Sequence, residues 1–364
     1  MGVFPVVIPL PSKYLSGLNL HLEMDRHASS TPASTPDCSG NPAESLKKMF
    51  VDQTMGPRIA AGQCPVRRAV FLKPHGVAKA DFFVLPDLPA EYRLGIFAQQ
   101  QFEAWVRLSS DTVPGAPDLK TTTGIAIKLF GVKGKKLLPG EEEGTTADFL
   151  LQNMNVFFVD TAKDMCEFTQ AGVVDHDYDK YLNTHPVTKK ILDEMEKVVP
   201  DCLSISYWSG LPYAFGKKKV KYKLEPIPPP FSTPPSQNNR DYLQSSLQAA
   251  LNLGEAQFKF MVQFQTDPGK MPLDKATVEW SEKDSPPVQL ATLVIRQQDI
   301  SVQGQADYGE NLSFNPWRTL EEHAPQGSLN EARKIVYQAG ARLRHYMNGI
   351  PAAEPSSPRT TGKP

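Results

Sequence analysis

The residues best suited to chemistry lie near the C-terminus, in residues 328–346, which are predicted to form one helix. Ser328 and Glu331 have the spacing of a capping box, in which the two side chains satisfy free backbone N–H groups at a helix start. Arg333, Tyr337 and Arg344 then share one face, because residues four and seven apart recur on the same side of a helix.

A tyrosine with an arginine one helical turn before it is a specific chemical arrangement. The guanidinium of Arg333 can favour the phenolate form of Tyr337. A phenolate is one of the few protein groups that bind ferric heme iron. Gly340 leaves the same face bare, so a flat molecule could approach the backbone there. Alone, this pattern also fits an ordinary amphipathic helix, so the surrounding sequence is needed to distinguish the two interpretations.

The sequence around this helix resembles the catalase-like heme proteins. Residues 314–337, beginning Phe314-Asn-Pro-Trp-Arg, are similar to the passage that leads to the proximal tyrosine of that superfamily. The resemblance extends over roughly residues 55–348 and is closest to the short catalase-related branch; allene oxide synthase domains belong to the same broad group. Further similar stretches, in the order of a catalase barrel, are residues 68–76, 103–110, 124–130 and 153–160.

The resemblance implies an α+β fold, a closed antiparallel β-barrel with appended helices and a C-terminal helix that carries the heme ligand. Short runs rich in β-branched and aromatic residues agree with it. They predict strands near residues 80–85, 102–108, 124–130, 156–159, 204–208, 219–224, 257–265 and 288–296. The predicted organisation is an N-terminal arm (1–54), the barrel (55–310) with a helical insertion (about 161–200), a heme-proximal helical segment (311–350) and a disordered tail (351–364).

The cofactor that the resemblance implies is heme b, with Tyr337 as the iron ligand and Arg333 supporting its phenolate. Phe157 would form an apolar wall. Arginine suits the two heme propionates because its planar guanidinium binds carboxylates bidentately. The arginines implied for the propionates are Arg68, Arg107 and Arg344.

The distal side departs from the catalase pattern. A catalase needs a histidine to move a proton between the peroxide oxygens and an asparagine to orient the peroxide, but Phe71 stands at the histidine position. Gln152 stands at the asparagine position, with Asn153 beside it. Ser109 matches the serine that hydrogen-bonds the distal histidine. Since phenylalanine cannot act as a general acid or base, a role worth roughly 10²–10⁴-fold in rate, hydrogen peroxide dismutation should be poor.

His75 is the alternative proton carrier. It lies four residues after Phe71, so in a regular strand both face the same side, about 13 Å apart. Pro74 and Gly76 could bend the chain and bring His75 into the pocket. The other interpretation is a histidine that is hydrogen-bonded behind the pocket.

Composition narrows the remaining classes. The net charge of −1 gives no argument for nucleic acid as a partner. There is no run of about 18 apolar residues, the length that spans a membrane. Four cysteines without metal-type spacing predict reduced thiols and a cytoplasmic protein. These cysteines are Cys38, Cys64, Cys166 and Cys202.

The predicted function is that of a heme-dependent oxidoreductase or a hydroperoxide isomerase or lyase. An apolar distal wall at Phe71 favours an organic hydroperoxide, or another organic substrate of specialised metabolism, because it desolvates and holds a carbon chain. One alternative is a catalase or peroxidase that uses His75. A second is a non-catalytic heme-binding or gas-sensing protein. As catalase-like barrels generally associate, a homodimer or larger homo-oligomer is expected.

Overall fold

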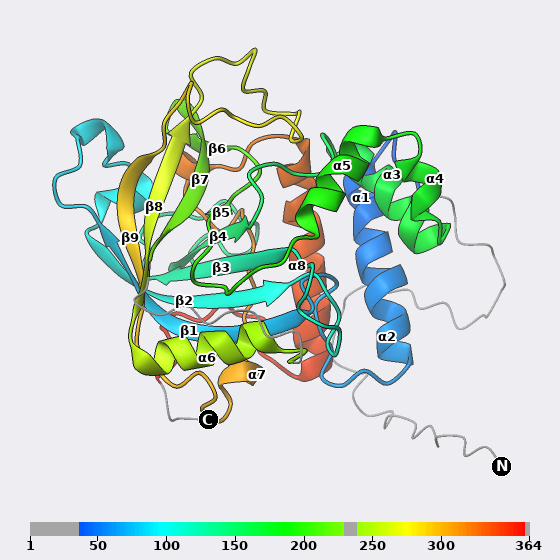
Figure 1. Cartoon of the computed structure of the whole chain (residues 1–364), viewed down its shortest axis with the longest axis horizontal. Helices are drawn as coiled ribbons and strands as arrows, with labels where there is room; N and C mark the ends of the chain where they lie inside the picture. Colours follow the sequence, from blue (N-terminus) through cyan, green and yellow to red (C-terminus); the bar gives the residue numbers. More distant parts are fainter. Residues whose placement is uncertain (1–35, 229–238, 361–364) are drawn as a thin grey trace. The chain divides into compact units, whose positions relative to one another are not determined.

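Eight strands form a closed antiparallel ring in the computed structural model, which describes residues 36–228 and 239–360. The order around the ring is β1-β2-β3-β4-β5-β7-β8-β9, β9 pairs back with β1, and β6 adds to the margin of β7 (Figure 1). The predicted closed antiparallel barrel is therefore confirmed. The strands are β1 (Lys73–Val84), β2 (Gln101–Ser110), β3 (Thr123–Phe130), β4 (Thr146–Gln152), β5 (Tyr207–Trp208), β6 (Tyr213–Phe215), β7 (Lys218–Ile227), β8 (Ala256–Phe264) and β9 (Val288–Ile295).

Alternating side chains fill the barrel and leave its outside for other groups. On β2, Val106 and Leu108 belong to the buried core inside the ring, whereas Trp105 and Arg107 point outward. Successive residues of a strand face opposite sides of a sheet, so the same alternation holds on β3 and β4. Aromatic rings pack inside the barrel, for example Phe149, whose centroid lies 4.7 Å from that of Phe260. A binding site must therefore lie outside the ring.

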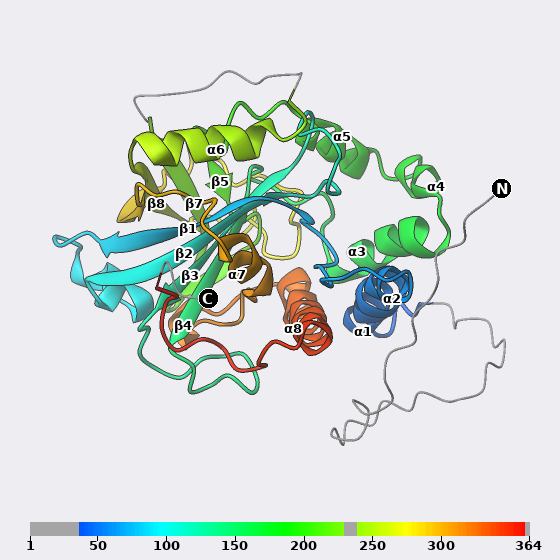
Figure 2. The same ribbon diagram turned by 90° about the horizontal axis from the view of Figure 1, so that it is seen from below.

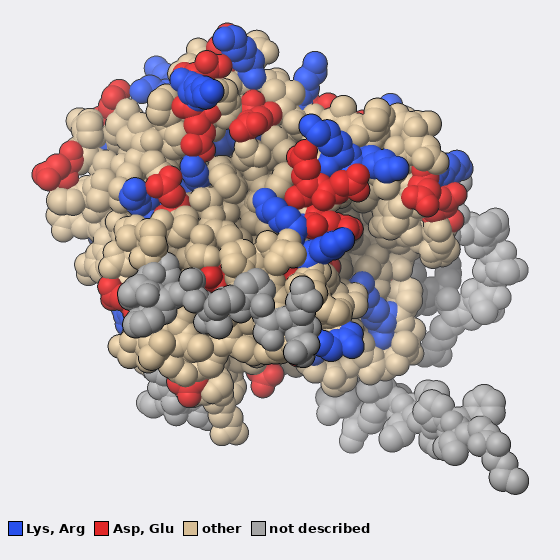
Figure 3. Space-filling model, viewed as in Figure 1, with Lys and Arg blue, Asp and Glu red and all other residues tan. Residues whose placement is uncertain are grey.

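Most of the helices gather on one side of the barrel, whereas α6 packs on β1 (Figure 1). Figures 1 and 2 show α8 between the sheet and the N-terminal helices α1 and α2, which are continuous with the π-helical segment η2. Charges of both signs are interspersed on the face of the molecule in Figure 3. No helix of the described residues is long and apolar enough to cross a membrane. The helices are α1 (Pro42–Lys47), η2 (Lys48–Met55), α2 (Gly56–Ala60), η3 (Ala90–Tyr92), η4 (Gly95–Ala98), α3 (Ala162–Thr169), η5 (Gln170–Val174), α4 (Tyr178–Leu182), α5 (Pro186–Met195), α6 (Tyr242–Leu253), α7 (Gln305–Asn311), η6 (Glu321–His323) and α8 (Ser328–Asn348).

One predicted strand is wrong. Residues 156–159 are irregular, because the backbone N–H of Phe157 donates to the carbonyl of Ala276 instead of to a neighbouring strand. The strand at this point of the barrel is β4, which the sequence analysis missed. An apolar aromatic run was mistaken for a strand next to the real one.

The single helix predicted at residues 328–346 is confirmed, but its capping box is wrong. Gly327 is the residue before the helix, so Ser328 already has a helical position. The backbone N–H and the hydroxyl of Ser328 both donate to Oδ1 of Asp274, at 2.7 and 2.9 Å. The helix start is therefore capped by a carboxylate from a distant segment.

Two of the four cysteines form a disulfide, which corrects the prediction of reduced thiols. Cys38 and Cys166 are bonded, with Cα atoms 5.5 Å apart. Cys64 and Cys202 are free. The bond ties the chain before α1 to α3, and it removes the cysteine-based argument for a cytoplasmic protein.

The two ends of the chain also differ from expectation. The predicted N-terminal arm falls partly outside the described residues, but its end, from Pro42 on, is helical. The predicted disorder after residue 350 does not hold for residues 351–360, which run back along the barrel (Figure 2). In that segment Glu354 is buried and ion-paired with Arg318 at 3.0 Å. The guanidinium of Arg359 donates to the carbonyl of Gly304 at 2.8 Å.

Candidate functional site

The outer face of strands β2 to β4 presents rows of side chains toward α7 and α8. Residues that pair across antiparallel strands point to the same face, so the pairing defines the rows. One row is Ser109, Gly124 and Gln152. The neighbouring row is Arg107, Ala126 and Leu150. Ala126, Leu150 and Gln152 remain partly exposed, so this face is not closed over by the segments above it.

Phe71 lies on the first of these rows. Its backbone has φ 52°, the left-handed region, which turns the chain just before β1. A Cβ added to Gly124 would lie only 2.8 Å from Cε1 of Phe71, so the ring rests directly on the glycine. Ser109 and Gln152 flank that glycine in the row. The structure thus brings together three of the predicted distal residues, and it does so because Gly124 has no side chain.

Gln152 and Asn153 have different surroundings. The side-chain Nε2 of Gln152 donates to the carbonyl of Val156 at 3.2 Å. Asn153 is buried at the end of β4, where its Oδ1 accepts from the backbone N–H of Thr123 at 3.1 Å. Its Nδ2 is buried and has no hydrogen-bond partner in the described part of the chain. Gln152 is therefore the residue on the outer face, and Asn153 joins the strand end to β3.

His75 does not lie in this row. It is fully buried at an irregularity of β1, with Nδ1 4.0 Å from Oδ1 of Asp118, and neither ring nitrogen has a hydrogen-bond partner among the described residues. Lys73 lies in the same cluster. Its Nζ forms ion pairs with the carboxylates of Asp118 and Asp241, at 2.6 and 2.8 Å. Burial, with the positive charges of Lys73 and Arg107, lowers the pKa of His75 to about 3. His75 is thus neutral and enclosed, although not hydrogen-bonded as one interpretation expected.

The three predicted propionate arginines do meet, around a carboxylate that the sequence analysis missed. Glu310 of α7 forms ion pairs with two of them. Its Oε1 lies 3.0 Å from Nη1 of Arg68, and its Oε2 lies 3.6 Å from Nη2 of Arg107. Arg344 of α8 joins this arginine cluster (Arg68, Arg107 and Arg344) and donates to the carbonyl of Leu312 at 3.0 Å. No motif marks Glu310 in the sequence, since only the fold brings α7 to β2 and α8.

The electrostatics of the arginine cluster follow from burial. Burial and the charge of Arg68 lower the pKa of Arg107 to about 9. Burial also lowers the pKa of Arg68 and of Arg344. For Glu310, burial alone would raise the pKa of the carboxyl, but Arg68, Arg107 and Arg344 outweigh it and lower that pKa. Glu310 is therefore ionised, and the cluster keeps a positive balance.

The arginine cluster contains buried hydrogen-bond donors that lack an acceptor among the described residues. Nε of Arg107 and Nε of Arg344 are buried without a hydrogen-bond partner in the residues that the structure describes. Buried donors of this kind are rarely left unpaired in a folded protein. Two carboxylates would satisfy them, which is the chemistry of the heme propionates. The unpaired guanidinium donors therefore fit the propionates of a heme on the outer face.

Tyr337 and Arg333 are adjacent on α8 as predicted. The guanidinium carbon of Arg333 lies 5.1 Å from the centroid of the Tyr337 ring. A second tyrosine, Tyr213 of β6, also interacts with Arg333. Burial alone would lower the pKa of Arg333, but the hydroxyls of Tyr337 and Tyr213 outweigh it and raise that pKa. Tyr213 is a site residue that sequence reasoning missed, because it lies on a strand far away along the chain.

Two other predicted features of the α8 face have packing partners. A Cβ at Gly340 would lie 3.6 Å from the sulfur of Met55, so η2 covers the bare glycine that was expected to admit a flat molecule. Phe157 stacks on Phe158 with centroids 4.5 Å apart and packs against the apolar cluster that contains Leu329 of α8.

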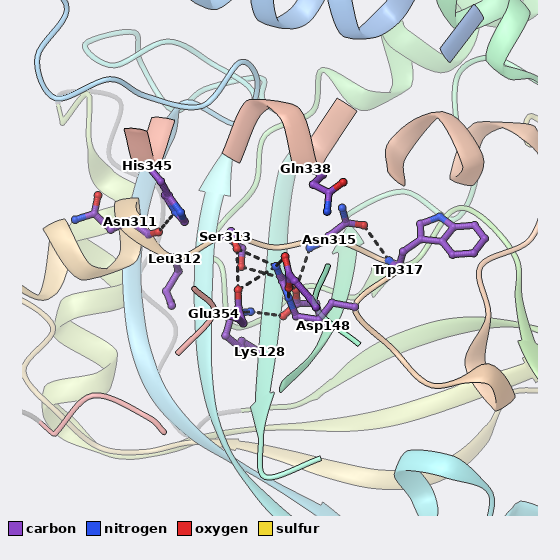
Figure 4. A network of polar contacts seen from close by, with 12 residues as sticks. Lys128, Asp148, Asn311, Leu312, Ser313, Asn315, Trp317, Gln338, His345 and Glu354 are labelled. Atoms are coloured by element: carbon purple, nitrogen blue, oxygen red, sulfur yellow. Dashed lines mark hydrogen bonds and ion pairs between the residues drawn. The ribbon is translucent and has the colours of Figure 1, made fainter. Parts of the chain in front are cut away.

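A buried polar network fixes the segment before α8 (Figure 4). Nζ of Lys128 bonds Asp148 at 2.8 Å, and Glu354 from the C-terminal segment pairs with both Lys128 and Arg318. Asp148 also accepts from the backbone N–H of Asn315 at 2.9 Å. A cavity of about 280 Å³ lies beside this network. It is lined by Tyr337, Phe314, Ala341, His345, Ala352 and Ala353, among others.

The described residues contain no group of three or more His, Cys, Asp or Glu side chains that could hold a metal ion. A heme iron needs only one protein ligand, since the porphyrin nitrogens supply four others. A single tyrosine beside an arginine satisfies that requirement.

Comparisons with known proteins agree on the fold. No protein-family model matches the sequence, and no curated protein matches it significantly. The structure is similar to a fungal catalase (TM-score 0.62, 18% identity, 80% of this chain and 63% of that one) and to catalase A from Saccharomyces cerevisiae (0.61, 18%, 79% and 63%). It is also similar to a bacterial catalase (0.61, 13%, 99% and 72%). The chain spans 63% of the length of the first two catalases. It has the catalase-like fold.

Proposed function

We propose that this chain binds heme b through Tyr337 and is a catalase-related heme enzyme that acts on an organic hydroperoxide. The observation that carries the proposal is the ring of Phe71, which rests on Gly124 between Ser109 and Gln152. The resemblance to catalases implies that Phe71 takes the place of the distal histidine. An apolar ring there favours a substrate with a carbon chain over hydrogen peroxide.

The residues that would hold the heme come from separate elements. Arg68, Arg107 and Arg344 would bind the propionates, Tyr337 would be the axial ligand, and Phe157 would cover an apolar edge. When bound, heme supplies an iron that can cleave an oxygen–oxygen bond. Arg333 would stabilise the phenolate form of Tyr337 by its positive charge, 5.1 Å from the ring.

The chain's own residues set the distal chemistry. Phe71 offers no proton at the position where a catalase holds an acid and base, so proton transfer between peroxide oxygens would lose roughly 10²–10⁴-fold. Its ring excludes water and would pack on the carbon chain of the substrate. Gln152 is the remaining amide on this face, and it would orient the oxygen end of the substrate after releasing Val156.

The two other candidate functions have less support. His75 is fully buried, unbonded and neutral, so a role as distal proton carrier would need β1 to rearrange. A heme protein without catalysis would keep its heme but show no substrate-dependent turnover. We also expect a homo-oligomer, which light scattering on the purified protein tests.

The test of the proposal is peroxide specificity. The heme-loaded wild type should turn over cumene hydroperoxide and break down hydrogen peroxide poorly. Phe71→His should raise hydrogen peroxide breakdown by at least about tenfold, because it restores the proton carrier beside Ser109. Phe83→His, which adds a histidine at an exposed position of β1, should not.

Two results would contradict the proposal. One is fast hydrogen peroxide breakdown by the wild type. The other is the collapse of turnover in His75→Ala, which would make His75 the distal base and return the protein to the catalase or peroxidase class.

A further inference from the structure

Glu310 occupies the centre of the arginine cluster without belonging to any motif. Its two carboxylate oxygens contact different arginines, Oε1 with Arg68 at 3.0 Å and Oε2 with Arg107 at 3.6 Å. Arg344 lies close enough to lower its pKa as well. We propose that Glu310 is the internal counter-ion of the arginine cluster, which leaves it two net positive charges and so matches it to a ligand with two carboxylates. The inference rests on the proposed heme site.

The charge count supports this role. Three buried guanidiniums and one buried carboxylate leave two positive charges. Arg67 also acts on Glu310, but more weakly than Arg68, Arg107 and Arg344 do. Burying three like charges without a counter-ion is costly, because each loses its hydration and repels the others. Glu310 offsets one charge and still leaves a site for a dianion.

The polar contacts show the same division. Glu310 forms ion pairs with Arg68 and Arg107. Backbone carbonyls accept hydrogen bonds from the same guanidiniums: Nη2 of Arg68 donates to Gly309 at 3.2 Å, and Nη2 of Arg107 donates to Phe71 at 3.0 Å. Nε of Arg107 and Nε of Arg344 have no acceptor within the described residues. The counter-ion thus positions the arginines and leaves donors for a ligand.

The position of Glu310 is fixed by the short helix α7. Nε2 of Gln305 donates to the carbonyl of Val77 on β1 at 2.7 Å. A Cβ at Gly309 would lie 2.7 Å from that of Val77, so the helix backbone packs directly on the strand. Glu310 therefore cannot withdraw without displacing α7, and it stays in the cluster when a ligand binds.

The test compares a dicarboxylic porphyrin with an uncharged one. Iron-free protoporphyrin IX and its dimethyl ester are titrated into the full-length protein without heme, and binding is followed by fluorescence. Neither probe needs the iron or its ligand. The readout is the ratio of the ester dissociation constant to that of the acid, which isolates the carboxylates from the fit of the ring.

We expect Glu310→Gln to melt at a lower temperature without ligand and to raise that ratio about tenfold, since three positive charges then face the two carboxylates. Glu310→Asp should keep the wild-type ratio within about threefold. Glu354→Gln, which removes a buried carboxylate from the other network, should melt lower without changing the ratio. In an Arg344→Met background, which lowers the ratio, adding Glu310→Gln should raise it again.

If Glu310→Gln alone does not fold, the same comparison is made in the Arg344→Met background, because that background contains one buried cation fewer. A ratio that Glu310→Gln leaves unchanged or lowers in the background that folds would overturn the role of Glu310 while leaving the heme proposal intact. Failure of the wild type to bind either porphyrin would overturn both.

Discussion

At the scale of single residues, the candidate site is built from side chains in unusual states. Phe71 has a left-handed backbone, which costs a non-glycine residue roughly 1–3 kcal/mol and persists where the surroundings enforce it. The carbonyl of Phe71 is held by Arg107 at 3.0 Å, and its ring by the gap at Gly124. The strain therefore lies at Phe71, the residue proposed to line the distal side.

The buried state of His75 predicts a dependence of stability on pH. In the unfolded chain His75 takes up a proton below its ordinary pKa of 6.5, whereas in the fold it stays neutral down to about pH 3. The stability linked to His75 is therefore complete above pH 6.5 and is lost as the pH falls toward 3, by at most about 1.4 kcal/mol per pH unit.

His75→Leu should consequently flatten the fall in unfolding free energy between pH 6.5 and pH 4, measured by urea unfolding. His176→Asn, at an exposed histidine, is the control and should follow the wild type. An unchanged slope in His75→Leu would mean that His75 is not enclosed as the structure has it.

At the scale of elements, the register of the strands creates the row of Ser109, Gly124 and Gln152. These residues come from three strands, and only the pairing of β2, β3 and β4 puts them side by side. The glycine matters because it lies between two polar side chains and under an aromatic ring. A shift of one residue in any strand would turn its member of the row to the barrel interior.

Gly124→Ala tests this row. The added Cβ would lie 2.8 Å from Cε1 of Phe71, so the ring must move, and we expect a loss of about 1–3 kcal/mol in unfolding free energy. Phe71→Leu should recover part of that loss in the double variant. Gly254→Ala, where the new Cβ meets no atom within 4 Å, is the control. Strictly additive effects at Gly124 and Phe71 would show that the ring does not rest on the glycine.

The sequence predicted elements better than the contacts between them. The α8 helix and most strands follow from local patterns. The resemblance to catalases implied Phe71, Arg107 and Tyr337 as candidate site residues. Glu310 and Tyr213 were missed because their roles depend on distant segments that meet only in the fold. The capping role of Ser328 was misassigned for the same reason, since its partner Asp274 lies on another segment.

At the scale of the whole molecule, segments at both ends brace the site. The Cys38–Cys166 bond fixes the chain before α1, whose helical continuation η2 covers α8 at Gly340. At the other end, Glu354 enters the network of Lys128 and Arg318, next to the cavity beside Tyr337 (Figure 4). The C-terminal segment thus packs beside the cavity that Tyr337 lines.

Glu354→Gln should lower the unfolding free energy by about 1–3 kcal/mol, because buried groups of Lys128, Arg318 and Ser313 lose a charged acceptor. Glu331→Gln is the matched control: Glu331 forms an exposed pair with Lys334, and its loss should cost less than about 0.5 kcal/mol. Equal stability of the two variants in urea unfolding would refute the role of the C-terminal segment.

The ferric absorption spectrum of the reconstituted protein shows whether Tyr337 is the ligand of a heme iron. The wild type should bind one heme b per chain with the spectrum of a high-spin, phenolate-ligated iron. Tyr337→Phe should lose the heme or that spectrum, whereas Tyr213→Phe, which removes the other tyrosine beside Arg333, should keep the phenolate signature. A Tyr337→Phe protein that retains heme with an unchanged spectrum would show that Tyr337 is not the ligand.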